Sequence, residues 1–304
     1  MNIIQAPLKS SIRRQVVPIY SVHTNQILFT PKLNYLCTLM KMSFEDWLIR
    51  ESIPYDKPTK NSVYKSFITT NYHINNSIKV CYITYASPHV PSVAPLIFDT
   101  EDPDSIRIWE DQWEHKGEII RSRIMAFLGV ARTIHARKTT VRKITKPESS
   151  MFLNSNHMHG STNAKIKYGL FYNDALVAVT TFTWPRKFYT ESGIALSYGL
   201  SRHCSLNHFK VSGGLSKLMA HFIKNHSPDD IMTLVDLEWS TGASYNKLGF
   251  ELLERTAPEV FYIEPNTLNR YLPYQLEDRS LDPQQLIQIQ NRGNNKFKLI
   301  LGNK

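Results

Sequence analysis

The sequence predicts an α+β fold. Three observations predict this class: short β-prone runs in both halves of the chain, an apolar pattern of helical period at 114–128, and a glycine pair that opens a helix near residue 214. Strands and helices that alternate in this way pack into mixed layers. With 304 residues and 42% hydrophobic side chains, the chain can form two domains or one large one.

In the first half, Ser43 precedes the run 44–49 as an N-cap, with Asp46 three residues later, so we expect a short capped helix before Pro54. β-prone runs predict strands at 66–70, 80–85 and 104–109. An amphipathic helix over 114–128 follows, with Gly129 as its C-cap. Its apolar face contains Ile119, Ile120, Ile124, Phe127 and Leu128.

In the second half of the chain, the expected strands and helices are easier to delimit. Strands are expected at 168–172 and 176–183, joined by a turn at Asn173 and Asp174, then at 195–204 and 231–237. A helix starts after the glycine pair and runs to about Lys224, and a shorter one occupies 243–248. The runs 251–254 and 260–263 could form a final hairpin. The polar segment after Tyr274 is expected to pack only loosely.

Charge points to a polyanionic partner. The chain has 36 Lys plus Arg against 26 Asp plus Glu, a formal net charge of +10. Between residues 115 and 147 there are nine basic residues and one acid, Glu118. We expect a nucleic acid, DNA first, on this stretch, because such side chains contact phosphates; a generic solvated basic face is the alternative. The candidate contacts are Arg121, Arg123, Arg132, Arg137, Lys138, Arg142 and Lys143.

Cysteine spacing and hydropathy argue against other classes. Cys37, Cys81 and Cys204 form no CxxC pair, so we expect neither a disulfide framework nor a metal site. The uncharged run 80–98 contains three prolines, which is wrong for a membrane helix. We therefore expect a cytoplasmic protein without a membrane partner.

The glycine pair lies in the segment Val211, Ser212, Gly213, Gly214, Leu215 and Ser216. Two glycines allow close approach of a ligand, and the following helix N-terminus can hold a pyrophosphate; an ordinary strand-to-helix turn is the alternative. Some thirty residues later, Ala243, Tyr245, Gly249 and Phe250 form a pattern that resembles the C-terminal motif of the GCN5-related N-acetyltransferases. The resemblance implies a mixed sheet, acetyl-CoA or another acyl-CoA bound by the amides of 211–216, and Tyr245 as general acid toward the CoA thiolate. The glycine loop departs from the usual Arg or Gln-x-x-Gly-x-Gly or Ala pattern.

A second resemblance covers residues 43–300, strongly after residue 105 and poorly before it. The segments 106–113, 152–160 and 201–214 resemble the end of Vsr-like phage homing endonucleases and the Mom-type DNA-modification domain fused to them, which acts on adenine in DNA. It implies a restriction-endonuclease-like α/β domain at 1–114, a basic helix and connector at 115–147 and the acetyltransferase-like domain at 148–304. It also implies that the protein acts in the cytoplasm of a host cell. Because 57–98 contains no Asp or Glu to hold a divalent metal, we expect a degenerate domain without nuclease activity.

Two residues are candidate bases for acyl transfer. His157 lies in a histidine pair with His159, which has no evident third metal ligand, and Asp236 ends an apolar strand. With Tyr245 as acid, they predict an acyl-CoA-dependent acyltransferase that acts on nucleic acid or on a substrate bound to it, such as a DNA base. The alternative is a non-catalytic protein that binds DNA, RNA or a host protein. A third, less favoured hypothesis is an active endonuclease that uses acids near Asp99 or Asp104.

Overall fold

The computed structural model divides the chain into two compact units, 1–41 and 42–304. In the first, β1 (Ile19–His23) and β2 (Gln26–Thr30) pair antiparallel. The structure describes residues 19–23, 26–30, 42–64, 67–75, 77–85, 104–191 and 193–301. The acids Asp99, Glu101 and Asp102 and the start of the expected strand at 66–70 lie outside these residues.

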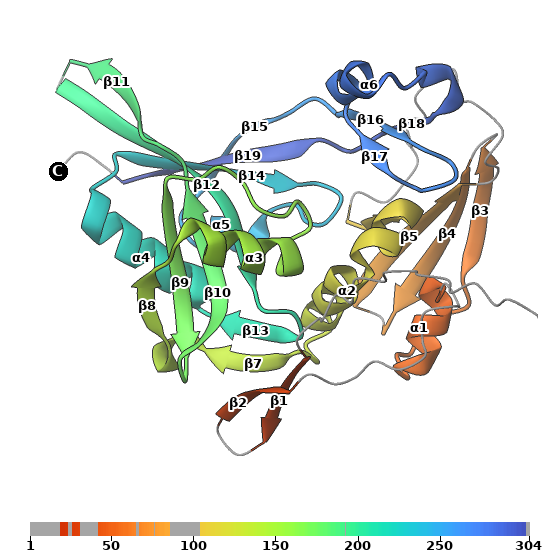
Figure 1. Ribbon diagram of the computed structural model, residues 1–304, viewed down its shortest axis with the longest axis horizontal. Helices are drawn as coiled ribbons and strands as arrows, with labels where there is room; N and C mark the ends of the chain where they lie inside the picture. The colour runs from red at the N-terminus through yellow and green to blue at the C-terminus, as the bar shows by residue number, and fades with distance from the viewer. Residues whose placement is uncertain are drawn as a thin grey trace, which may run out of the picture. The chain divides into compact units, whose positions relative to one another are not determined.

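The second unit begins with a small sheet in the order β3-β4-β5-β6, of which β3, β4 and β5 are orange in Figure 1. Its strands are β3 (Thr59–Tyr64), β4 (Phe67–Ile74), β5 (Ile78–Tyr85) and β6 (Ile106–Trp109), of which only β5 and β6 run parallel. Helix α1 (Phe44–Arg50) has the capping box between Ser43 and Asp46, as predicted. Helix α2 (Glu110–Phe127) begins four residues before the predicted start, and both helices pack on the sheet around Phe44, Trp47 and Trp113.

A mixed eight-stranded sheet forms the rest of the core, which confirms the α+β prediction. Its main order is β15-β19-β14-β12-β10-β9-β8, with β11 paired to β12, and only β12 and β14 run parallel. The strands are β8 (Thr140–Lys143), β9 (Ile166–Tyr172), β10 (Ala175–Phe182), β11 (Arg186–Thr190), β12 (Gly193–Ser205), β14 (Asp230–Asp236), β15 (Glu251–Arg255) and β19 (Asn294–Ile300).

Helices cover both faces of the middle of this sheet. Helix α3 (Lys146–Asn156) and helix α4 (Gly214–His226) both contact β9 and β10, and Figure 1 shows α3 in front of these strands and α4 behind them. On the α4 side, the fully buried rings of Phe182 and Phe222 stack with centroids 3.7 Å apart. Between α2 and the sheet, β7 (Arg132–His135) and β13 (Phe209–Ser212) pair parallel, and the short helix η1 (Ala136–Lys138) follows β7.

The C-terminal expectations were partly wrong. The expected hairpin does not form, because β15 pairs with β19, whereas β16 (Val260–Ile263) pairs with β17 (Arg270–Tyr271) and β18 (Ile287–Gln290). The segment after Tyr274 is not loosely packed. It contains most of α6 (Pro273–Arg279), η2 (Pro283–Gln285), β18 and β19, and alternation of apolar and polar residues buries Ile287, Ile289 and Phe297.

The small sheet and the three-stranded sheet share one apolar core. Trp109 and Ile83 pack with Ile287 and other residues of the three-stranded sheet. Nearby, Arg270 forms a bidentate ion pair with buried Asp111 at 2.7 and 2.9 Å. The boundaries expected at 114/115 and 147/148 fall inside α2 and α3, so a cut at either one would break a helix.

Two features are absent from the described residues. Among them, no helix is long and apolar enough to cross a membrane. In the same part of the chain, no three His, Cys, Asp or Glu side chains come together as a metal site.

Candidate active site

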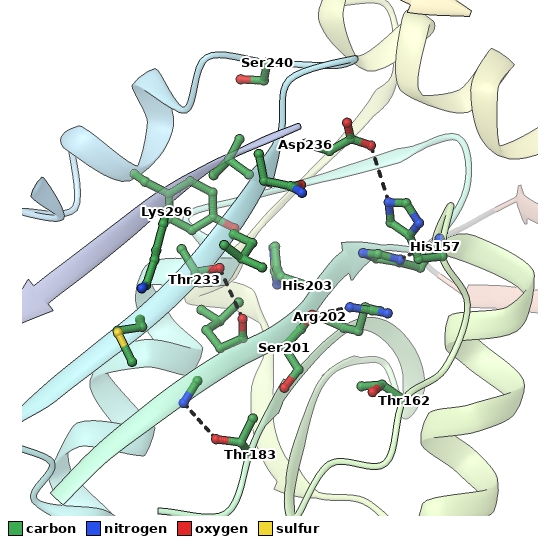
Figure 2. Close-up of a pocket in the computed structure, with 18 of the residues that line it drawn as sticks. His157, Thr162, Thr183, Ser201, Arg202, His203, Thr233, Asp236, Ser240 and Lys296 are labelled. Carbon is green, nitrogen blue, oxygen red and sulfur yellow. Dashed lines mark hydrogen bonds and ion pairs between the residues drawn. The ribbon is translucent and has the colours of Figure 1, made fainter. Parts of the chain in front are cut away.

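A cavity of about 730 Å³ opens between β12 and β14, and Figure 2 shows its lining. The two strands pair only from Ser197 to Leu200 and from Asp230 to Thr233, where the Thr233 hydroxyl donates to the Leu200 carbonyl at 3.1 Å. Beyond this point each strand pairs only with its outer neighbour, β10 or β19. The parallel strands therefore separate toward their C-terminal ends and leave a cleft in the sheet.

A histidine and a carboxylate meet at one end of the cavity. Asp236 is the last residue of β14, and its Oδ2 lies 3.4 Å from Nε2 of His159 (Figure 2). The backbone N–H of Glu238 also donates to Asp236, at 2.9 Å. Burial alone would raise the pKa of Asp236, but the contacts with His159, the Glu238 N–H and Arg123 hold it below its ordinary value. Asp236 is therefore a carboxylate at neutral pH and can orient the His159 ring.

His157 lies beside this pair, at the C-cap of α3. Its Nδ1 accepts a hydrogen bond from the His159 backbone N–H at 3.1 Å. Burial, reinforced by His159 and by the charges of Arg202 and Arg123, lowers the pKa of His157 to about 2. The ring is therefore neutral at physiological pH, and so low a pKa makes it a weak base.

Tyr245 comes to the same cavity from the short helix α5 (Ala243–Asn246). Gly242 caps this helix at a φ of 97°, and the Tyr245 ring packs edge-on against Phe250 with centroids 5.4 Å apart. Burial raises the pKa of Tyr245, against the opposing effects of the Thr233 hydroxyl and Arg123. The phenol therefore keeps its proton at neutral pH and can act as a proton donor.

The candidate nucleic-acid contacts differ in their surroundings. Arg123 lines the cavity instead, with its guanidinium carbon 4.1 Å from the ring centroid of Trp239, and burial lowers its pKa to about 10. The apolar face of α2 packs near Trp239, so a residue at the margin of that face turns inward. Arg121 forms an ion pair with Glu118 at 2.7 Å. The other candidates are exposed, and they are Arg132, Arg137, Lys138, Arg142 and Lys143.

The glycine segment 211–216 lies outside the cavity. It joins β13 to α4, and Gly213 adopts a φ of 75° that favours glycine. A Cβ on Gly214 would lie 3.1 Å from a methyl group of Val211 and 3.3 Å from one of Leu170, so the packing around this glycine is tight. The N-terminus of α4 has no side-chain cap and no acid in its first turn.

The structure thus brings together Tyr245, His157 and Asp236, which the sequence singled out separately. His159, Arg123 and Lys296 line the same cavity, although no sequence pattern gave them a role in acyl transfer. Position at the end of β14 marked Asp236, but no local pattern connects it with His159, 77 residues away in sequence.

Comparisons with known proteins give partial likenesses. No model of a protein family matches the chain, and no curated protein matches it. A Bacillus subtilis acetyltransferase solved with CoA is 14% identical, with a TM-score of 0.33 over 54% of this chain and 100% of that chain. The ribosomal-protein-S18-alanine N-acetyltransferase of Escherichia coli is 11% identical, with a TM-score of 0.33 over 55% and 96%. An Arabidopsis thaliana protein solved with a bisubstrate analogue that contains CoA is 16% identical, with a TM-score of 0.34 over 53% and 97%.

Proposed function

We propose that this chain is an acyl-CoA-dependent N-acyltransferase whose acceptor amine is carried on, or bound to, a nucleic acid. The observation that carries the proposal is the cavity between β12 and β14, which holds a protonated phenol and a histidine–carboxylate pair. Acyl transfer to an amine needs a base for the amine proton and an acid for the leaving thiolate. Modification of a DNA base, the finer form of the proposal, rests on the sequence resemblance.

His159 takes the role of base in this proposal, with Asp236 as its partner. Its Nε2 faces the Asp236 carboxylate, so Nδ1 is the nitrogen free to accept a proton, and the carboxylate stabilises the resulting imidazolium. The acceptor nitrogen forms a bond to the acyl carbon and the carbon–sulfur bond breaks. The amine proton passes to His159, and the Tyr245 hydroxyl protonates the sulfur. His157, with its pKa near 2, helps to hold His159 through the hydrogen bond to its backbone N–H.

Two features fit the donor. The first-turn amides of α4, at Gly214, Leu215 and Ser216, lack a side-chain cap and would hold a pyrophosphate at the positive end of the helix dipole. The edges of β12 and β14 that face the cleft would bind the amide groups of an extended CoA arm in the manner of an added strand. Acyl-CoA supplies the activated acyl group.

The test combines donor binding with turnover. Acetyl-CoA should raise the melting temperature of the wild-type protein, because a ligand of the native state stabilises it by mass action. Tyr245→Phe should still bind acetyl-CoA but should release free CoA at least about 100-fold more slowly with a mixed-sequence single-stranded oligonucleotide as acceptor. The matched control is Tyr274→Phe, a change at an exposed tyrosine on α6, which should behave as wild type. Absence of acetyl-CoA binding would overturn the proposal.

One observation favours a second function, nucleic-acid binding without catalysis. The glycine segment lies outside the cavity, and Gly214 packs tightly against Val211 and Leu170. In that case acetyl-CoA would not change the melting temperature, whereas an oligonucleotide would raise it in a salt-dependent manner.

A further inference from the structure

A group of lysines lies where β8, α3 and β9 meet. Lys143 ends β8 and pairs in register with Tyr168 of β9, and Lys146 is the first residue of α3. Lys165 directly precedes β9, and Lys167 is its second residue. Burial lowers the pKa of Lys167, and the charges of Lys146, Lys165 and Lys143 lower it further. The Lys167 ammonium donates to the Ala164 carbonyl at 2.5 Å.

Acidic side chains do not compensate this group. Among the described residues, none of the four lysines forms an ion pair with an acid. The nearby acid on α3, Glu148, is held in the capping box with Thr145. Like charges gathered in this way repel one another, so the cluster favours a polyanion.

An exposed tryptophan continues the cluster. The Lys165 ammonium lies 3.8 Å from the ring centroid of Trp184, whose side chain is 60% exposed. After Trp184 the chain enters β11, which in the described part of the sheet pairs with β12 alone and projects with it beyond the other strands (Figure 1). Arg186 and Lys187 are exposed on this ribbon, and Tyr189 is 88% exposed.

This surface leads to the candidate active site. Thr183 and Arg186, which flank Trp184 and Pro185 in sequence, both line the cavity, and so does Thr162 (Figure 2). We name the whole the lysine–tryptophan surface. It consists of Lys143, Lys146, Lys165, Lys167, Trp184, Arg186 and Lys187.

We propose that the lysine–tryptophan surface binds a single-stranded nucleic acid and leads an unpaired nucleotide into the cavity between β12 and β14. The cations contact successive phosphates, and Trp184 stacks on an unpaired base, as on other single-strand binding surfaces. A duplex would not serve, because its bases are already stacked and its reactive edges are paired. Binding itself does not depend on acyl transfer, but the role of the cavity rests on the proposed function.

The test measures binding of a fluorescein-labelled single strand of about 20 nucleotides, longer than the usual site of one binding fold, and of the same sequence as a duplex. The double change Lys143→Gln with Lys165→Gln should lower the slope of log K against log salt by about 1.4, since each phosphate contact contributes about 0.7 on a single strand. Trp184→Ala should weaken binding of the single strand about fivefold or more at both low and raised salt and leave binding of the duplex unchanged.

The control removes equal charge elsewhere. Lys57 and Lys247 are exposed and lie outside this surface, so the double change to glutamine should leave the slope unchanged. Equal effects of control and test variants would overturn the proposal, as would binding that is insensitive to Trp184→Ala. Melting curves establish that each variant is folded.

A competition separates this proposal from the acyltransferase proposal. Excess acetyl-CoA should leave the single strand bound, and the surface variants should still bind acetyl-CoA. Displacement of the strand by acetyl-CoA would show that the surface serves the nucleotide of CoA, and would overturn the strand proposal alone. Binding of acetyl-CoA without any binding of the strand would have the same consequence and would leave the acyltransferase proposal standing.

Discussion

Glu238 is a buried residue whose removal should cost this protein much of its stability. Its side chain is 3% exposed and accepts hydrogen bonds from the Trp109 indole at 3.1 Å and the Arg292 backbone N–H at 2.7 Å. Its Oε1 also lies 3.4 Å from the guanidinium of Arg107, which is equally buried. These contacts join β6 to the segments after β14 and before β19, so they hold the small sheet against the large one.

Glu238→Ala would leave the Arg107 charge and the two N–H donors buried without this partner. Breaking a buried ion pair by removing one member costs about 3–5 kcal/mol, a large share of the roughly 5–15 kcal/mol of a typical fold. We therefore expect the free energy of unfolding in urea to fall by about 3–5 kcal/mol. Replacing both members, by Arg107→Met with Glu238→Leu, should restore most of this loss, since apolar isosteres avoid the desolvation penalty.

Glu51 provides the matched control. Its ion pair with Arg50 is exposed, with side-chain exposures of 36% and 58%, so Glu51→Ala should cost less than about 1 kcal/mol. A loss below about 1 kcal/mol for Glu238→Ala, or equal losses for the single and double variants, would refute the view that an uncompensated buried charge is the cause.

Two further predictions concern stability. The pKa of His157 is about 6.5 in the unfolded chain and about 2 in the folded chain. Between these values the unfolded state binds more protons, so the free energy of unfolding rises with pH, by at most about 1.4 kcal/mol per pH unit. Urea denaturation from pH 4 to 7 should show a shallower rise for His157→Gln than for wild type or for a His73→Gln control at an exposed position; identical slopes would contradict the assignment. Phe222→Ala should lower the free energy of unfolding by about 3–5 kcal/mol, because it removes one of two fully buried stacked rings, whereas Phe188→Ala, at a side chain 49% exposed, should change it by no more than about 0.5 kcal/mol. Thermal or urea denaturation of both variants measures the difference, and similar losses would contradict it.

Local patterns determined much of the fold class. The capping box at Ser43, the turn at Asn173 and Asp174, and the helix after Gly213 depend on interactions within a few residues, so the sequence alone predicts them. The end of an apolar strand likewise marked Asp236, and the helix before Gly249 marked Tyr245. The side chains that surround Asp236 and Tyr245 could not be predicted from such local patterns.

Only the tertiary structure decided the site. The separation of β12 from β14 depends on which strands pair. The residue pattern within one strand shows which of its faces is buried, but it does not show which distant strand pairs with it. For the same reason, three features could not be predicted from the sequence. They are the position of β19 between β14 and β15, the orientation of Arg123 into the cavity, and the contact of His159 with Asp236. The sequence alone determined the charge of this protein and those elements that depend on local patterns. The packing of distant segments decided which side chains share a cavity, because burial and charge pairing are properties of the assembled sheet.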